Sequence, residues 1–142
     1  MSRLTANAEK LHRLLDAESG TMAEVNFPHH WREYGWRHGG NVVTVRFHGE
    51  GLNKRPNLER CYDDILRVAE EQGVRMVKGV SLGFSTTRIF VADAFHKNTD
   101  PFLRISVGVE SDQIQAVARV VLSGIKRYCI SAMPVNLNYA ML

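Results

Sequence analysis

Residues 102–121 read FLRISVGVESDQIQAVARVV, and the first half of this stretch has the pattern of a strand. Aliphatic side chains alternate with other residues, at Leu103, Ile105, Val107 and Val109. A period of two predicts a strand over 102–109 with one buried face. Arg104 occupies an intervening position, so we expect its side chain to point away from the aliphatic face.

The second half of the same stretch predicts an amphipathic helix. Ser111 is a residue type that caps helices, and Asp112 follows in the first turn, where the helix dipole favours an anion. Apolar residues then recur at helical spacing, at Ile114, Val117, Ala118, Val121, Leu122 and Ile125. The stretch therefore reads as strand, tight turn and helix.

The N-terminal part of the chain predicts a helix followed by two strands. One face of the helix carries Leu4, Ala8, Leu11 and Leu15, and Ser19 and Gly20 end it. Residues 22–28 (MAEVNFP) read as a short strand stopped by Pro28, and residues 41–48 (NVVTVRFH) alternate as a second strand. The polar segment between them reads as a connection. Its histidines, His29, His30 and His38, lack metal-ligand spacing and are expected to be loop residues.

A second helix is expected from Asn57, which is a capping residue type, to Gly73, which supplies a C-terminal stop. Its apolar stripe is Leu58, Tyr62, Ile65, Leu66 and Ala69. Two short β-like runs follow at 74–78 and 87–92, around the loop 79–85.

Because long helices separate pairs of strands, we expect an α+β fold: a mainly antiparallel four-stranded sheet with helices packed on one face. The other face would stay uncovered. Together with an apolar tail at 129–142, that face suggests a surface for a partner or an oligomer. We expect one domain over 1–128 and assign no role to the tail.

The composition of the chain bounds its class. With 142 residues and 44% hydrophobic content, it is long enough for one domain with its own core. The net charge of +3 is scattered along the chain, so we expect no nucleic-acid partner. Cys61 and Cys129 form no CxxC pair and fit structural thiols in a reducing compartment. The sequence shows no secretory signal and no apolar run of membrane-spanning length, which predicts a cytoplasmic protein.

No catalytic motif stands out from the residues themselves. The sequence has no GxSxG elbow, no GxxxxGK[ST] phosphate loop and no GxGxxG after a strand. On the pattern alone, Arg104 has two interpretations. It is either a solvated strand residue whose stem covers apolar neighbours, or a clamp for an anion.

A series of segments, taken in order, resembles the C-terminal part of the cystathionine γ-synthase and γ-lyase family, which contains pyridoxal-phosphate-dependent enzymes of cysteine and methionine metabolism with the type I aminotransferase fold. The resemblance runs from about Arg3 to Ile125. The segments are RLTANAEKLHRLL, VNFP, the Gly39–Gly40 pair leading into VVTVRF, SLG at 81–83 and LRISVGVES at 103–111. The last is the most specific, and SLG is the second.

The resemblance implies roles at the substrate site for three residues and a structural role for two more. Arg104 matches the arginine that binds the α-carboxylate of the amino-acid substrate, a task that suits a permanently charged, bidentate guanidinium. Ser81 matches the serine beside that carboxylate, and Leu82 shapes the wall. Glu110 and Ser111 belong to the turn behind the site.

The chain also departs from the family. After SLG the family continues with a second glycine, an acidic residue and a serine, whereas this chain continues with residues 84–88, FSTTR. None of its lysines matches the Schiff-base lysine of the family; they are Lys10, Lys54, Lys78, Lys97 and Lys126. Without that lysine there is no electron sink for carbanion chemistry.

The resemblance therefore implies the substrate-carboxylate-binding part of a transsulfuration-type lyase or transferase. Such a part would need a separate large domain to supply pyridoxal phosphate and the catalytic lysine, and we expect no activity from the chain alone. The alternative is a non-catalytic binding or regulatory module with the same fold.

Overall fold

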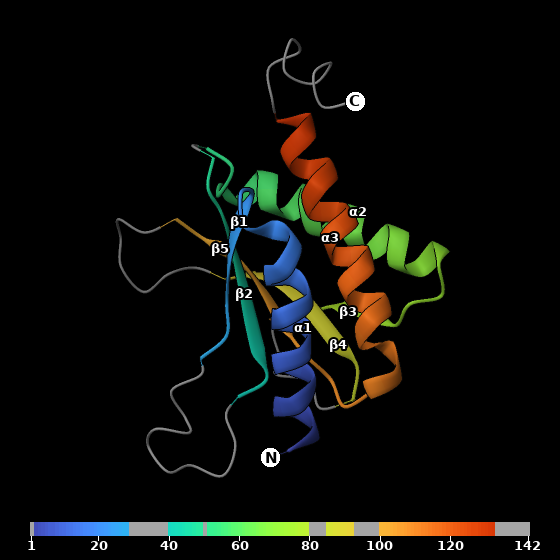
Figure 1. Ribbon diagram of the computed structural model, residues 1–142. Coiled ribbons are helices and arrows are strands. Elements are labelled where there is room, and N and C mark those ends of the chain that lie inside the picture. The colour runs from blue at the N-terminus through green and yellow to red at the C-terminus, as the bar shows by residue number, and fades with distance from the viewer. Residues whose placement is uncertain (1, 29–39, 50, 80–84, 93–99, 133–142) are drawn as a thin grey trace.

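The structure is a computed structural model that describes residues 2–28, 40–49, 51–79, 85–92 and 100–132 (Figure 1). The helices are α1 (Arg3–Ser19), α2 (Arg55–Glu71) and α3 (Ile114–Ser131), with a short 3₁₀ turn, η2 (Ser111–Gln113), directly before α3. The strands are β1 (Ala23–Asn26), β2 (Val42–Phe47), β3 (Met76–Lys78), β4 (Thr87–Ala92) and β5 (Phe102–Ser106). The expected α+β class is confirmed.

The strands form one five-stranded sheet in the order β1-β2-β5-β4-β3. Neighbouring strands are antiparallel except β3 and β4, which are parallel, with Met76 opposite Thr87 and Lys78 opposite Ile89. The expectation of a four-stranded, mainly antiparallel sheet was therefore wrong in strand number. The run at 74–78 is too short for its sequence to show how it pairs, and it adds a parallel edge strand beyond β4.

The core lies between the sheet and the three helices. Strand residues at alternate positions are fully buried, including Val43, Leu103 and Ile105, and they form one cluster with buried residues of α1, α2 and α3. In Figure 1, α3 crosses in front of α2 and runs beside α1. At one close approach, a Cβ added to Gly124 of α3 would lie 2.3 Å from a side-chain carbon of Ile65 on α2. The helices thus pack together on one face of the sheet.

The remaining strand positions define what we call the open face of the sheet, which α1, α2 and α3 do not cover. On the three central strands its residues are Val42, Thr44, Arg46, Arg88, Phe90, Ala92, Phe102 and Arg104, which are half-buried, and Ser106, which is buried. This arrangement confirms that Arg104 points away from the aliphatic face.

The helix starts differ from the expectation at two positions. Helix α2 begins at Arg55, two residues before Asn57, because Pro56 in the first turn has a backbone angle already suited to a helix. Asn57 instead donates to the carbonyl oxygen of Gly51 at 3.3 Å. Ser111 does not cap α3 either, since it opens η2 and its hydroxyl lies 3.5 Å from the carbonyl oxygen of Val109.

The C-terminal ends of the helices agree better with the sequence predictions than their starts do. Gly73 follows α2 with a φ of 69°, a conformation that favours glycine, as its expected role as a stop requires. Helix α1 ends at Ser19, as expected. Helix α3 continues through residue 128 to Ser131, and Cys129 packs in the core. The helix therefore extends into the segment expected to be a tail, of which residues 133–142 lie outside the described residues.

Candidate functional site

Arg104 lies near the middle of the open face. Strand pairing places it between Thr44 of β2 and Phe90 of β4, and the residues on either side of it, Leu103 and Ile105, have no exposed surface. In the described part of the chain, its guanidinium has no hydrogen-bond or ion-pair partner. It is therefore a permanent positive charge, half-buried on the sheet face that the three helices leave open, and no described residue neutralises it.

The backbone at the end of β5 is closely packed against the segment 85–87. The amide of Val109 donates to the carbonyl oxygen of Ser85 at 3.3 Å. A Cβ added to Gly108 would lie 2.2 Å from that same oxygen, so only glycine permits this approach. The side chain of Asn7 on α1 donates to the carbonyl oxygen of Gly108 at 2.9 Å and secures the other side.

These contacts concern the second expected element of the site. Ser81 and Leu82, expected beside the substrate carboxylate, lie outside the described residues. The chain that follows them, at Ser85, is tied to the end of the strand that carries Arg104. The fold therefore holds Ser85 next to the residues that follow β5, and the roles of Ser81 and Leu82 stay a prediction.

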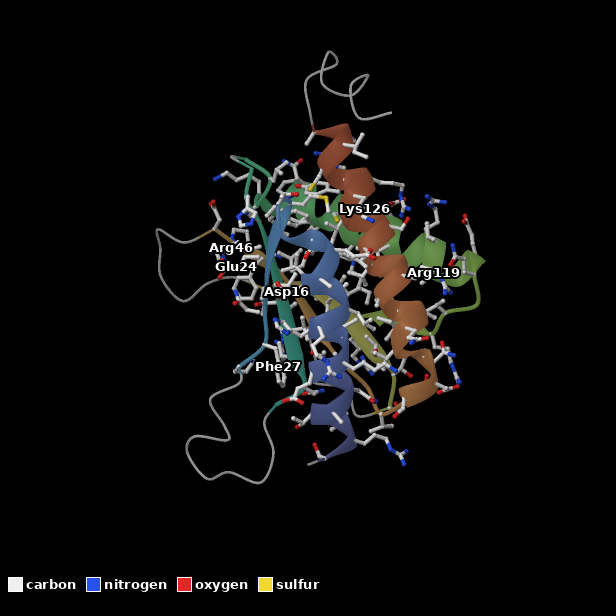
Figure 2. The ribbon with its side chains drawn as sticks, in the orientation of Figure 1. Asp16, Glu24, Phe27, Arg46, Arg119 and Lys126 are labelled. Carbon is white, nitrogen blue, oxygen red and sulfur yellow. The ribbon has the colours of Figure 1, made fainter. Side chains whose placement is uncertain are left out.

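Arg46, a second arginine of the open face, already has partners. Its guanidinium donates to the carbonyl oxygen of Asp100 at 3.3 Å and lies 5.2 Å from the centre of the Phe102 ring. The carboxylate residue Glu24 is its direct cross-strand neighbour on β1, and Figure 2 shows the two beside each other. Arg46 is thereby committed to contacts within the chain, unlike Arg104.

Arg88, a third arginine of the open face, resembles Arg104 in that no described residue pairs with its charge. Its Nε atom is buried and has no hydrogen-bond partner. Its side chain lies against Gly79, where an added Cβ would be 2.9 Å from Nη1. Sequence reasoning treated Arg88 only as a departure from the family pattern. The period of two in 87–92 was the signal that could have placed it on the face of Arg104.

The described residues do not fit pyridoxal phosphate. A Schiff-base lysine must lose its proton, whereas the neighbouring Tyr62 side chain raises the pKa of Lys78 above its usual value. Lys54 pairs with Asp100 at 3.1 Å, and Lys126 pairs with Glu18 at 3.6 Å. Lys10 belongs to α1, across the sheet from Arg104, and Lys97 is outside the described residues.

A groove on the described surface lies elsewhere, away from the open face. A groove of about 600 Å³ runs between α1 and α3, with an apolar floor that includes Leu14 and Leu122 and a charged rim that includes Arg119 and Lys126. Figure 2 labels the two cations on α3. This groove lies on the helix side, so the sheet separates it from Arg104.

Two further features bear on chemistry. Among the described residues, no cluster of three or more histidine, cysteine or acidic side chains could bind a metal ion. Within those same ranges, no helix combines the length and apolar character needed to cross a membrane.

The chain was compared with known proteins. Over 138 residues it is 83% identical to a curated protein of Aspergillus flavus named "Bifunctional enzyme flvA". The match covers 97% of this chain and 17% of that protein, so the chain spans about a sixth of the length of its relative. No protein-family model matches the chain. No solved structure matches it either.

Proposed function

We propose that this chain is the substrate-carboxylate-binding part of a larger pyridoxal-phosphate-dependent enzyme of cysteine and methionine metabolism, a lyase or transferase of the transsulfuration type. The observation that carries the proposal is the guanidinium of Arg104, half-buried on the open face of the sheet without a partner in the described chain. A guanidinium in that setting binds a carboxylate through two parallel hydrogen bonds.

The relative supports the first half of this proposal, the dependence on a larger protein. A segment 83% identical to this chain belongs to a polypeptide of which it makes up 17%, and that polypeptide is named a bifunctional enzyme. The described lysines do not fit the cofactor, so the cofactor and its lysine are assigned to a separate large domain. The open face is the surface on which the substrate, held by Arg104, would meet that domain.

Coexpression tests this assignment. The chain is produced with a second polypeptide that corresponds to the remainder of the flvA relative. We expect the two to copurify and to develop the yellow absorbance of bound pyridoxal phosphate. Failure of both copurification and absorbance would contradict the need for a large cofactor-bearing partner.

The role of Arg104 is tested in the same complex. Arg104→Gln should weaken amino-acid binding by about 10- to 100-fold, because it removes a charge-assisted hydrogen-bond pair. Copurification and cofactor absorbance should be unchanged. Arg119→Gln, on the exposed side of α3, is the matched control. It should leave amino-acid binding, copurification and cofactor absorbance unchanged. Equal binding in the Arg104 and Arg119 variants would contradict a carboxylate clamp.

A second candidate function is a non-catalytic binding or regulatory module. The poor fit of Lys54, Lys78 and Lys126 to Schiff-base chemistry favours it. A chain with Arg104 but without a suitable lysine could bind a carboxylate and could not catalyse the reaction by itself. Calorimetric titration of the isolated chain with amino acids distinguishes the two. Binding without cofactor that Arg104→Gln abolishes, combined with failure to assemble with the large polypeptide, supports the module.

A further inference from the structure

We propose that Arg88 forms a second anion-binding position on the open face, so that the site takes a ligand with two anionic groups, such as a dicarboxylate or an amino acid with an acidic side chain. This inference rests on the proposed role of Arg104 as the clamp for the first carboxylate. It adds that a second acidic group distinguishes the preferred ligand.

The strand pairing brings the two arginines together. Arg88 of β4 is opposite Ser106 of β5, and Arg104 lies two residues along β5 from Ser106. Such diagonal neighbours on one face of an antiparallel pair are about 7–8 Å apart, within reach of long side chains. The two arginines thus start from adjacent backbone positions on one half-buried face, and the side chain of Arg88 extends from there toward Gly79.

The described part of the chain supplies no counter-charge to either of them. In the part of the chain that the structure describes, neither guanidinium has an ion-pair partner, whereas Arg46 on the same face contacts Asp100 and Phe102. The two guanidinium charges on this face repel each other, and the repulsion grows as water is excluded. An anion between or beside them would remove that repulsion.

The buried Nε of Arg88 is a second, independent observation. A buried donor without a partner carries a desolvation cost that a native structure normally avoids, and the cost is greater for a charged group. Gly79 creates the space in which this side chain lies, because any Cβ there would meet Nη1 at 2.9 Å. An unsatisfied donor on a cationic group beside a carboxylate clamp is suited to an incoming acidic group.

The positions also indicate why two anionic groups are needed. Gly79 bonds to β4 through its amide, which donates to the carbonyl oxygen of Ile89, so it continues the line of β3. Arg88 starts on β4, and its side chain extends toward this line, on the side of β4 opposite to Arg104 and β5. Two strand spacings amount to roughly 10 Å, more than one carboxylate can bridge. A short dicarboxylate spans such a gap when each end meets one guanidinium.

Titration of the isotope-labelled chain with glutarate and butyrate tests the inference. The two probes share a carboxylate and a short carbon chain, and only glutarate carries the second anion. We expect glutarate to bind about tenfold or more tightly than butyrate and to shift the Nε–H resonance of Arg88. Arg88→Gln should bring glutarate down to the affinity of butyrate and leave butyrate unchanged.

Further variants separate failure of this inference from failure of the clamp. Arg104→Gln should weaken both probes, and Arg88→Lys, which keeps the charge and the stem, should retain part of the glutarate preference. Arg119→Gln should change neither. Equal binding of both probes by the unaltered chain overturns the second anion position and leaves the clamp intact. If neither probe binds, the clamp and this inference fall together. Well-dispersed spectra of each variant show that it is folded.

Discussion

The amide of Gly108 donates a hydrogen bond to the hydroxyl of Thr87 at 3.1 Å, and this contact joins the end of β5 to the first residue of β4. It lies in the interior, where both groups are shielded from water. Both arginines of the proposed site, Arg88 and Arg104, are within four residues of this junction. The relative position of the two charges therefore depends on it.

Gly108→Ala should destabilise the chain by about 1–3 kcal/mol, the usual cost of overpacking. The new Cβ would lie 2.2 Å from the carbonyl oxygen of Ser85, which is backbone and cannot move aside cheaply. Urea unfolding measures the effect. Gly20→Ala is the control, because nothing lies within 4 Å of its Cβ and its φ is −53°. That control should be neutral or stabilising by about 0.4–1 kcal/mol. Equal losses in both variants would contradict the close approach at Gly108.

Asn53→Ala should destabilise the chain by about 2 kcal/mol or more. The buried Asn53 side chain accepts from the amide of Phe47 at 2.9 Å and donates to the carbonyl oxygen of Phe47 at 2.7 Å. Its loss leaves two buried backbone groups unpaired, at roughly 1–3 kcal/mol each. Asn57→Ala, whose bonds are at the surface, should cost much less in the same denaturation experiment. Similar midpoints for the two variants would show that Phe47 finds other partners.

Asp64 should make stability depend on acid pH. Partial burial opposes its ionisation, but hydrogen bonds from Arg127 and Arg67 outweigh burial and lower its pKa below the usual value. Because the folded-state pKa is depressed, the stabilisation is present above about pH 4 and is lost as the pH falls through the folded-state pKa. Solvent screening limits it to less than about 1 kcal/mol.

The measurement is urea unfolding of Asp64→Asn at pH 7 and at pH 2. The variant should be less stable than the unaltered chain at pH 7 and equal to it at pH 2. Asp16→Asn, exposed on α1, is the control and should show no such change (Figure 2). A difference that persists at pH 2 would mean that Asp64 acts through packing and not through its charge.

Cys61 should react slowly with alkylating reagents. Burial, with a smaller effect of the nearby Cys129, raises the pKa of the Cys61 thiol to about 12. The thiolate fraction at pH 8 is then roughly a thousandfold lower than in the unfolded chain. The raised pKa also means that stability falls as the pH rises from about 9 towards 12. Labelling with iodoacetamide, with and without denaturing urea, measures the contrast; similar rates in both would contradict a protected thiol.

The features that could be predicted from the sequence depend on local pattern. The alternation around Arg104 requires only that a strand has one buried face, and Leu103 and Ile105 are fully buried as expected. The stop at Gly73 follows from its own backbone conformation. The predicted helix start at Asn57 was wrong, because it used capping preference alone and did not take account of Pro56 in the first turn.

The features that could not be predicted depend on segments distant in the sequence. Nothing in residues 76–78 indicates that they pair parallel with β4, because the direction of pairing is decided by the rest of the fold. The same limit applies to the site. The face of Arg88 follows from its alternation, but the absence of a partner for its Nε depends on Gly79 and on every neighbouring side chain.

The lengths of the outer strands have a practical consequence for the experiments above. The sheet ends in β1 and β3, which contain only four and three residues. Short outer strands present few unpaired backbone groups on which another chain can add, and Glu24 and Lys78 place charges on these two strands. Although the surface of β3 includes Val77, which is 41% exposed, there is little template for edge-to-edge aggregation. The chain should therefore stay in solution at the concentrations that spectroscopic titration requires, even when it is produced apart from a larger polypeptide.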